Sequence, residues 1–85
     1  MNVFPDTIRR LSSIDGGVVL DLKRGTLFRV NPVGAKVLDL LAQGNSQEQI
    51  AEKLSVEWQV AWSDVQADVG EFLESLKAHG VIVAG

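Results

Sequence analysis

The sequence predicts an α+β fold, in which a three-stranded antiparallel sheet is followed by three helices. Two observations support this. Apolar residues recur with a period of about two up to Asn31 and of about 3.6 beyond it. Turn and cap residues, among them Gly25, Asn31 and Gly44, stand where strands and helices should end. Because the chain has 85 residues, we expect one domain spanning residues 1–85.

Three segments have the composition of short strands: residues 8–11, 18–22 and 26–30. We expect a three-residue hairpin loop, Lys23-Arg24-Gly25, in which Gly25 takes a positive φ. In the resulting register, one side of the sheet carries the opposed pairs Leu20 with Phe28 and Val18 with Val30, and the other side carries Val19, Asp21, Leu27 and Arg29. A slip of one residue would exchange the two sets.

Asn31 and Pro32 predict the start of the first helix, because Asn caps free N–H groups and Pro suits the first helical position. This helix should cover residues 32–42 and end at Gly44. Its expected buried side consists of Val33, Val37, Leu38 and Leu41.

Ser46 and Gln49 predict a capping box for the second helix, and Ser63 and Gln66 predict one for the third, which should end near His79 before Gly80. The expected apolar stripes are Ile50, Ala51 and Leu54, and then Val65, Val69, Phe72, Leu73 and Leu76. We expect Trp58 and Trp62 to lie in the connecting loop and fill space beside the second helix. Residues 81–83 should pack on the body as an apolar tail. The second and third helices have the outline of a helix-turn-helix, so the whole predicts a winged helix with its sheet placed first.

Charge is divided unevenly along the chain, whose net charge is −3. Residues 1–36 carry six basic and three acidic side chains, whereas residues 37–85 carry two basic and eight acidic ones. The absence of cysteine excludes disulfides and thiolate chemistry and is consistent with a reducing compartment. No apolar stretch approaches the roughly 20 residues that span a bilayer. We therefore expect a soluble, cytoplasmic protein with no membrane partner.

Residues 16–55, GGVVLDLKRGTLFRVNPVGAKVLDLLAQGNSQEQIAEKLS, resemble the PqqD-like family. The most specific segment is Val30-Asn31-Pro32-Val33-Gly34-Ala35, and the similarity extends over roughly residues 14–83. Leu20-Asp21-Leu22 departs from the second strand of strict PqqD, which resembles Leu-Tyr-Pro-Glu-Gly. This departure favours a stand-alone relative from another pathway, such as lasso-peptide biosynthesis, over the quinone pathway itself.

The resemblance implies a recognition element for the leaders of ribosomally synthesised, modified peptides. The leader would add as a strand to the third strand, beside the third helix, and be delivered to a leader peptidase, cyclase or radical-SAM enzyme. The candidate peptide-binding residues are Leu27, Phe28, Arg29 and Val30 on the strand, and Val65, Asp68, Val69, Phe72 and Leu76 on the helix. Each also has a purely structural interpretation, as core for most of the apolar residues and as a solvated surface charge for Arg29 and Asp68.

The main alternative is a winged-helix DNA-binding regulator, since residues 37–65 also resemble the helix-turn-helix of LuxR-type regulators. The third helix, however, carries Asp64, Asp68, Glu71 and Glu74 against Lys77 alone, and DNA should repel such a face. We therefore expect no nucleic-acid partner. A structural adaptor that docks an enzyme and binds no peptide is a third possibility.

No catalytic constellation is visible in the sequence. There is one histidine, His79, and no His/Cys cluster or Gly-rich phosphate loop. We expect no enzymatic activity, no catalytic residue, no metal and no cofactor. The precursor, the pathway and the partner enzyme stay open, as does the choice between a monomer and a domain-swapped dimer.

Overall fold

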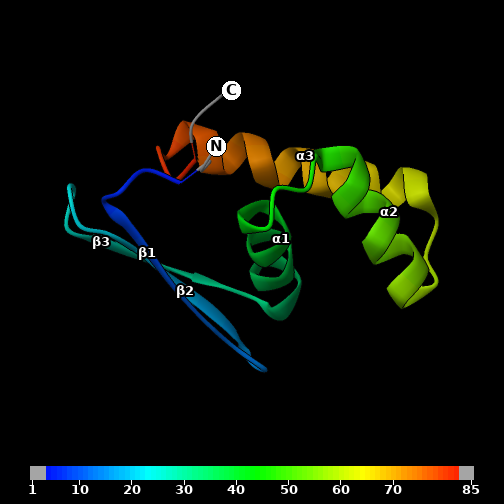
Figure 1. The fold of residues 1–85 in the computed structure, drawn as a ribbon, viewed down its shortest axis with the longest axis horizontal. Coiled ribbons are helices and arrows are strands. Elements are labelled where there is room, and N and C mark those ends of the chain that lie inside the picture. The colour runs from blue at the N-terminus through cyan, green and yellow to red at the C-terminus, as the bar shows by residue number, and fades with distance from the viewer. Residues whose placement is uncertain (1–3, 83–85) are drawn as a thin grey trace.

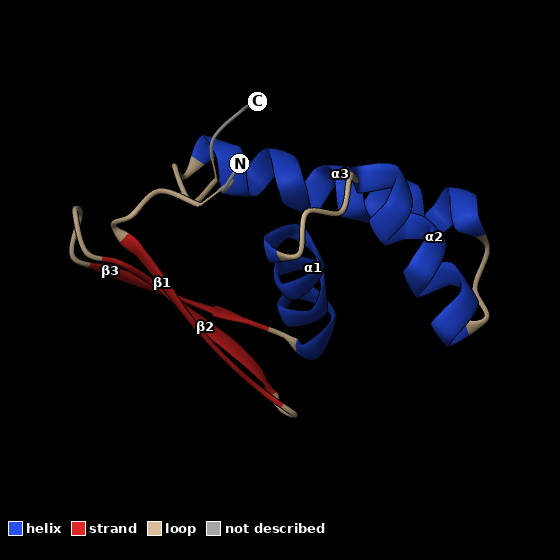
Figure 2. Cartoon of the chain, viewed as in Figure 1, coloured by secondary structure: helices blue, strands red, loops and turns tan. Residues whose placement is uncertain are grey.

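The computed structural model describes residues 4–82 and places a three-stranded sheet on one side of the chain and three helices on the other (Figures 1 and 2). The strands are β1 (Ile8–Ser13), β2 (Gly16–Asp21) and β3 (Thr26–Val30). The helices are α1 (Pro32–Ala42), α2 (Gln47–Trp58) and α3 (Trp62–Ala78). This order confirms the predicted α+β fold, including the bounds of the first helix.

The sheet has the order β1-β2-β3 with antiparallel pairs, so β1 and β3 are its edges. The predicted pairing of β2 with β3 is wrong by one residue. Phe28 lies opposite Val19 rather than Leu20, and Val30 lies opposite Gly17 rather than Val18. Val19 and Asp21, predicted to face away from the core, are both buried.

The cause of the shift lies in the hairpin turn, which holds four residues rather than three because Leu22 belongs to it. The Asp21 carboxylate accepts hydrogen bonds from the backbone N–H groups of Lys23 and Arg24, both at 3.1 Å. The Asp21 carbonyl accepts a further bond from Gly25, which has a φ of +67°. An aspartate that bonds backbone groups two and three residues ahead stabilises such a turn. Asp21 therefore ends β2 one residue earlier than predicted.

The core lies between the sheet and the helices, with α1 crossing β2. A Cβ at Gly17 would lie 2.9 Å from the Leu11 carbonyl oxygen and 3.2 Å from the Val30 side chain, so the close packing of β2 between its neighbours requires glycine there. The residues with the least exposed side chains are Val19, Val37, Ile50, Leu54 and Val81. Ile82 is also buried, which confirms that the tail packs on the body, although Val83 lies outside the described residues.

Local capping explains where the first two helices begin. Asn31 Oδ1 accepts the Gly34 N–H at 2.7 Å, and Ser46 forms the predicted capping box with Gln49. The third helix differs: it begins at Trp62 after Ala61, which makes no side-chain cap, so the predicted box at Ser63 and Gln66 is wrong. Its predicted end is confirmed, with His79 as the C-cap and Gly80 at a φ of +73°.

Three predicted burials are also wrong. Trp58 ends α2 and Trp62 begins α3, and their exposed fractions are 41% and 46%. Val33, predicted to face the core, is 48% exposed. All three side chains lie at the surface, and Trp58 and Val33 line the groove described next.

Candidate functional site

A groove runs between β3 and α3. Its larger part has a volume of about 560 Å³. It is lined by Arg29, Val30, Asn31, Val33, Gly34, Val37, Leu54, Trp58, Val60, Val65, Asp68, Val69 and Phe72. Most of these side chains are apolar, and only Arg29 and Asp68 carry charge. A largely apolar concavity with few polar groups is typical of a binding site.

A smaller hollow of about 170 Å³ continues the groove toward the C-terminal end of α3. It shares Arg29, Val30 and Phe72 with the larger part, so the two adjoin along β3. Its other lining residues are Val19, Phe28, Ser75, Leu76, His79 and Val81. Together the two parts form one groove that follows the strand, and we call it the β3–α3 groove.

The edge of β3 that faces this groove is free for pairing. Within residues 4–82, β3 pairs only with β2, on its other side. An unpaired edge presents a row of backbone N–H and C=O groups, which is a template for another extended chain. The groove therefore combines a backbone template with an apolar wall.

Eight of the nine predicted site residues line this groove. Arg29, Val30, Val65, Asp68, Val69 and Phe72 surround the larger part, and Phe28 and Leu76 line the smaller one. Val65, Val69 and Leu76 are also buried, and Phe28, Val30 and Phe72 pack against the core, so their structural interpretation holds as well. Leu27 is the exception: it lies opposite Leu20 and is 55% exposed on the other face of the sheet.

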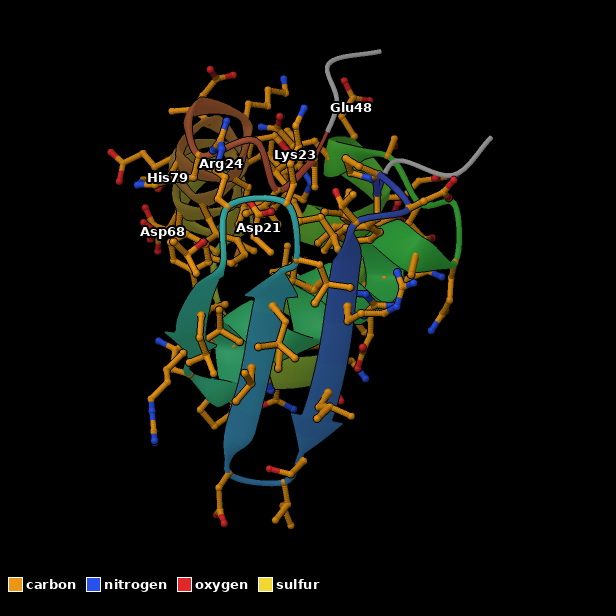
Figure 3. All side chains as sticks on the ribbon, turned by 90° about the vertical axis from the view of Figure 1, so that its left-hand side faces the viewer. Asp21, Lys23, Arg24, Glu48, Asp68 and His79 are labelled. Carbon is orange, nitrogen blue, oxygen red and sulfur yellow. The ribbon has the colours of Figure 1, made fainter. Side chains whose placement is uncertain are left out.

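Arg29 and Asp68 give the groove one charge on each wall. Both side chains are exposed, and no ion pair joins them in the described part of the chain. Figure 3 shows Asp68 on α3, to the side of β3. Opposed charges that do not bind each other are available to a ligand with complementary charges.

The hairpin turn contacts the C-terminal end of α3, beside the smaller part of the groove. Arg24 donates a hydrogen bond to the carbonyl of His79, the C-cap of α3, and its Nε lies 3.9 Å from the Asp21 carboxylate (Figure 3). The rings of Phe28 and His79 meet edge to face, with their centroids 5.6 Å apart. These contacts tie β3 and its turn to the end of α3, where Phe28 and His79 both line the smaller part of the groove.

Sequence reasoning missed the wall that α1 and the α2–α3 connection contribute. Asn31, Val33 and Gly34 come from the start of α1, and Leu54, Trp58 and Val60 come from the end of α2 and the connection. Val33, Trp58 and Val60 share one usable signal, because each is a large apolar residue beside a turn or helix end. The signal is weak, since single exposed apolar residues are common.

The described residues hold no group of three or more His, Cys, Asp or Glu side chains placed to bind a metal ion. None of the helices in that part of the chain is long and apolar enough to cross a membrane. Asp64, Asp68, Glu71 and Glu74 are all exposed along α3, where the DNA-binding alternative would need a basic helix.

Two solved structures are similar to this chain over nearly its whole length. One is TbiB1 in complex with the TbiA(beta) leader peptide, at 27% identity and a TM-score of 0.90, covering 100% of this chain and 98% of that one. The other is lasso peptide synthetase B1 complexed with the leader peptide, at 26% identity and a TM-score of 0.87, covering 95% of each chain. No curated protein sequence matches the chain significantly.

The sequence profile of the family described as coenzyme PQQ synthesis protein D (PqqD) matches residues 16–82. The match begins at β2 and ends after α3, so it includes both walls of the β3–α3 groove. It covers well over half of the chain and agrees with the resemblance seen in the sequence. The chain belongs to the PqqD family.

Proposed function

We propose that this chain binds the leader segment of a ribosomally synthesised precursor peptide and presents it to a processing enzyme. The leader adds to β3 as a fourth strand and lays alternate side chains into the β3–α3 groove. The observation that carries the proposal is the free edge of β3 beside an apolar groove of about 560 Å³. The two similar structures support it, because both are complexes with leader peptides.

The energetics of such a site divide between backbone and side chains. Each hydrogen bond to the β3 edge contributes about 0.5–1.5 kcal/mol, largely independent of the peptide's sequence. Each aliphatic side chain that becomes fully buried contributes about 1.5–3 kcal/mol. Selectivity for one leader over another therefore comes mainly from the groove, whose walls belong to α1, α3 and the α2–α3 connection.

The proposal assigns no chemistry to this chain. Binding by strand addition needs only a rigid edge and a complementary wall, and the whole of residues 1–85 acts as one recognition domain. Peptide-bond cleavage or modification is left to the enzyme that receives the leader. A lasso-peptide pathway is the favoured setting, because one of the two similar structures is a lasso peptide synthetase B1.

Val33→Glu tests the groove without endangering the fold. Val33 lines the groove, is 48% exposed and lies in the first turn of α1, which carries no acidic residue. A carboxylate near a helix N-terminus is favourable, so the variant should remain folded. Val69 is less suitable, because it is only 3% exposed and a charge there would disrupt the core.

The measurement is calorimetric titration with a synthetic leader of a precursor peptide identified from the DNA around this chain's gene. We expect Val33→Glu to weaken binding by about tenfold or more, since it replaces apolar contact with a charge. Val56→Glu is the matched control, because Val56 is 74% exposed and lies outside the groove. Equal affinity in both variants and the wild type would contradict the proposed site, and no binding to the wild type would contradict the function.

A further inference from the structure

The face of the sheet that points away from the helices is apolar at its centre. The pairings align two rows of side chains across the three strands on this face: Arg9, Leu20 and Leu27, and then Leu11, Val18 and Arg29. Four of the six are aliphatic. Figure 3 looks directly onto these strands, with the helices behind them. We call this surface the outer sheet face.

No other part of residues 4–82 covers the outer sheet face. Leu11 and Leu27 are 69% and 55% exposed, and Val18 and Leu20 between them are half-buried by their neighbours. The helices all lie on the opposite side (Figure 1). A contiguous apolar surface with a polar border marks an interaction site more often than scattered exposed residues do.

Two arginines lie on the border of the outer sheet face, and one acidic residue, Asp15, lies beside it in the turn between β1 and β2. Arg9 and Arg29 stand at opposite corners of the two rows, and neither forms an ion pair within the described residues. Within residues 4–82, Arg9 donates hydrogen bonds to the backbone carbonyls of Asp6 and Ile8. None of the six positions is acidic. Two copies of the face would set like charges against each other, so a partner with carboxylates around an apolar ridge fits better than a second copy.

The outer sheet face is continuous with the edge of β3. The alternation of the strand places Leu27 and Arg29 on the outer face and Phe28 and Val30 on the groove side, and the Arg29 side chain, at the strand edge, also borders the groove. A leader added to β3 would alternate in the same way, because successive side chains of a strand point to opposite faces. Half of its side chains would enter the groove, and the other half would extend the outer sheet face by one more row.

We infer that the outer sheet face is the docking surface for the enzyme that processes the leader, and that the bound leader completes this surface. The inference rests on the proposed leader binding and adds the partner and its location. The enzyme contacts Leu11, Leu20 and Leu27 through an apolar ridge and Arg9 and Arg29 through carboxylates. It also contacts the outward side chains of the leader, so it distinguishes the loaded protein from the empty one.

Such a composite surface couples the two binding events. If the leader raises the affinity for the enzyme, the enzyme must raise the affinity for the leader by the same factor, because the coupling free energy is reciprocal. Coupling of this kind is typically about 5- to 150-fold. The protein would thus release the leader more readily once the enzyme has dissociated.

The test uses the full chain, its leader peptide and purified processing enzymes identified from the DNA around its gene, each titrated separately by biolayer interferometry. Leu11→Glu places a charge on the outer sheet face, on the strand farthest from the β3 edge. Arg9→Glu reverses one charge of the border. Val56→Glu is the control, because it adds the same charge to a similarly exposed aliphatic position on α2.

We expect one enzyme to bind the loaded wild type at least fivefold more tightly than the empty wild type. Leu11→Glu and Arg9→Glu should each weaken that binding by about tenfold or more, whereas Val56→Glu should not change it. Leader affinity, measured by calorimetry without enzyme, should stay within about twofold of wild type in all three variants.

Three results would overturn the inference. The first is enzyme binding that Leu11→Glu leaves intact, and the second is an absence of enzyme binding to the loaded wild type. The third is a dimer of the wild type, detected by sedimentation velocity, that the Leu11→Glu substitution converts to a monomer. In that case a second copy of the chain, and not an enzyme, would occupy the outer sheet face. Loss of leader binding in the wild type itself would instead refute the proposed function, so the two failures remain distinct.

Discussion

Gly34 on α1 lies so close to Phe72 on α3 that a Cβ at position 34 would be 3.2 Å from Phe72 Cζ. The same Cβ would lie 3.3 Å from the side chains of both Asn31 and Val30. These three neighbours include two walls of the β3–α3 groove and the cap of α1. The contact therefore joins the stability of the fold to the shape of the proposed site.

Gly34→Ala should destabilise the protein and weaken leader binding. Overpacking costs about 1–3 kcal/mol, which exceeds the gain of up to about 1 kcal/mol from replacing glycine inside a helix. Displacement of the Phe72 ring should also narrow the groove. Urea denaturation would measure the first effect and calorimetry with the leader the second.

Gly70→Ala is the control for this substitution. Its Cβ would lie 2.9 Å from Gln47 Nε2, the end of a flexible side chain held there by one long hydrogen bond, of 3.5 Å, to the Gln66 carbonyl. We expect it to be neutral or stabilising. The close Gly34–Phe72 packing would be contradicted if both alanine variants were equally stable and bound the leader equally well.

Asp21→Ala should lower the free energy of unfolding by about 1–3 kcal/mol, because two backbone N–H groups lose a buried acceptor. Asp21 is 4% exposed, and its carboxylate holds the turn between β2 and β3. Asp15→Ala in the other, exposed hairpin turn is the control and should change stability by less than about 0.5 kcal/mol. Urea denaturation of both variants would measure the two free energies of unfolding. Equal denaturation midpoints for Asp21→Ala and Asp15→Ala would contradict the stabilisation of the β2–β3 turn by Asp21.

The register error shows which part of the fold the sequence could not determine. The strands and the hairpin were visible from alternation and from Gly25, and β3 was assigned to the correct faces. Which side chains of β2 point toward the core depends on whether Leu22 belongs to the strand or to the turn. That choice is made by the Asp21 carboxylate, whose hydrogen bonds to the turn are not apparent from alternation.

The candidate site was predictable in so far as it lies on two elements with strong local patterns. Eight of the nine proposed residues line the groove because the stripe of α3 and the inner residues of β3 follow from periodicity. The contribution of Val33, Trp58 and Val60 was not predictable. It depends on how α1 and the α2–α3 connection approach α3, and sequence spacing alone does not determine such tertiary geometry.

Ser46→Ala and Ser63→Ala should separate a real helix cap from an apparent one. Ser46 Oγ accepts the Gln49 N–H at 3.2 Å, so its loss should cost about 1 kcal/mol of stability. Ser63 lies inside α3, which begins at Trp62 without a side-chain cap, and its replacement should change stability by less than about 0.5 kcal/mol. A larger loss for Ser63→Ala than for Ser46→Ala, in thermal or urea denaturation, would restore the capping box predicted at Ser63.

Arg29→Ala should weaken the binding of an acidic leader by no more than about fivefold, because an exposed ion pair contributes about 0.2–1 kcal/mol. Arg29 borders the groove without an ion-pair partner in residues 4–82, so a leader carboxylate would find it available. The loss should shrink as salt is raised, since screening weakens exposed pairs. Calorimetry at low and high salt would measure it.

Lys23→Ala is the control for the net charge, because Lys23 is an exposed base in the hairpin turn that does not line the groove. A double-mutant cycle with a leader whose glutamate is replaced by glutamine isolates the pair from the general field. Coupling should appear with Arg29→Ala and be absent with Lys23→Ala. Equal coupling for both would mean that the basic N-terminal part attracts acidic leaders only through its overall charge, and Arg29 would then have no specific role in the groove.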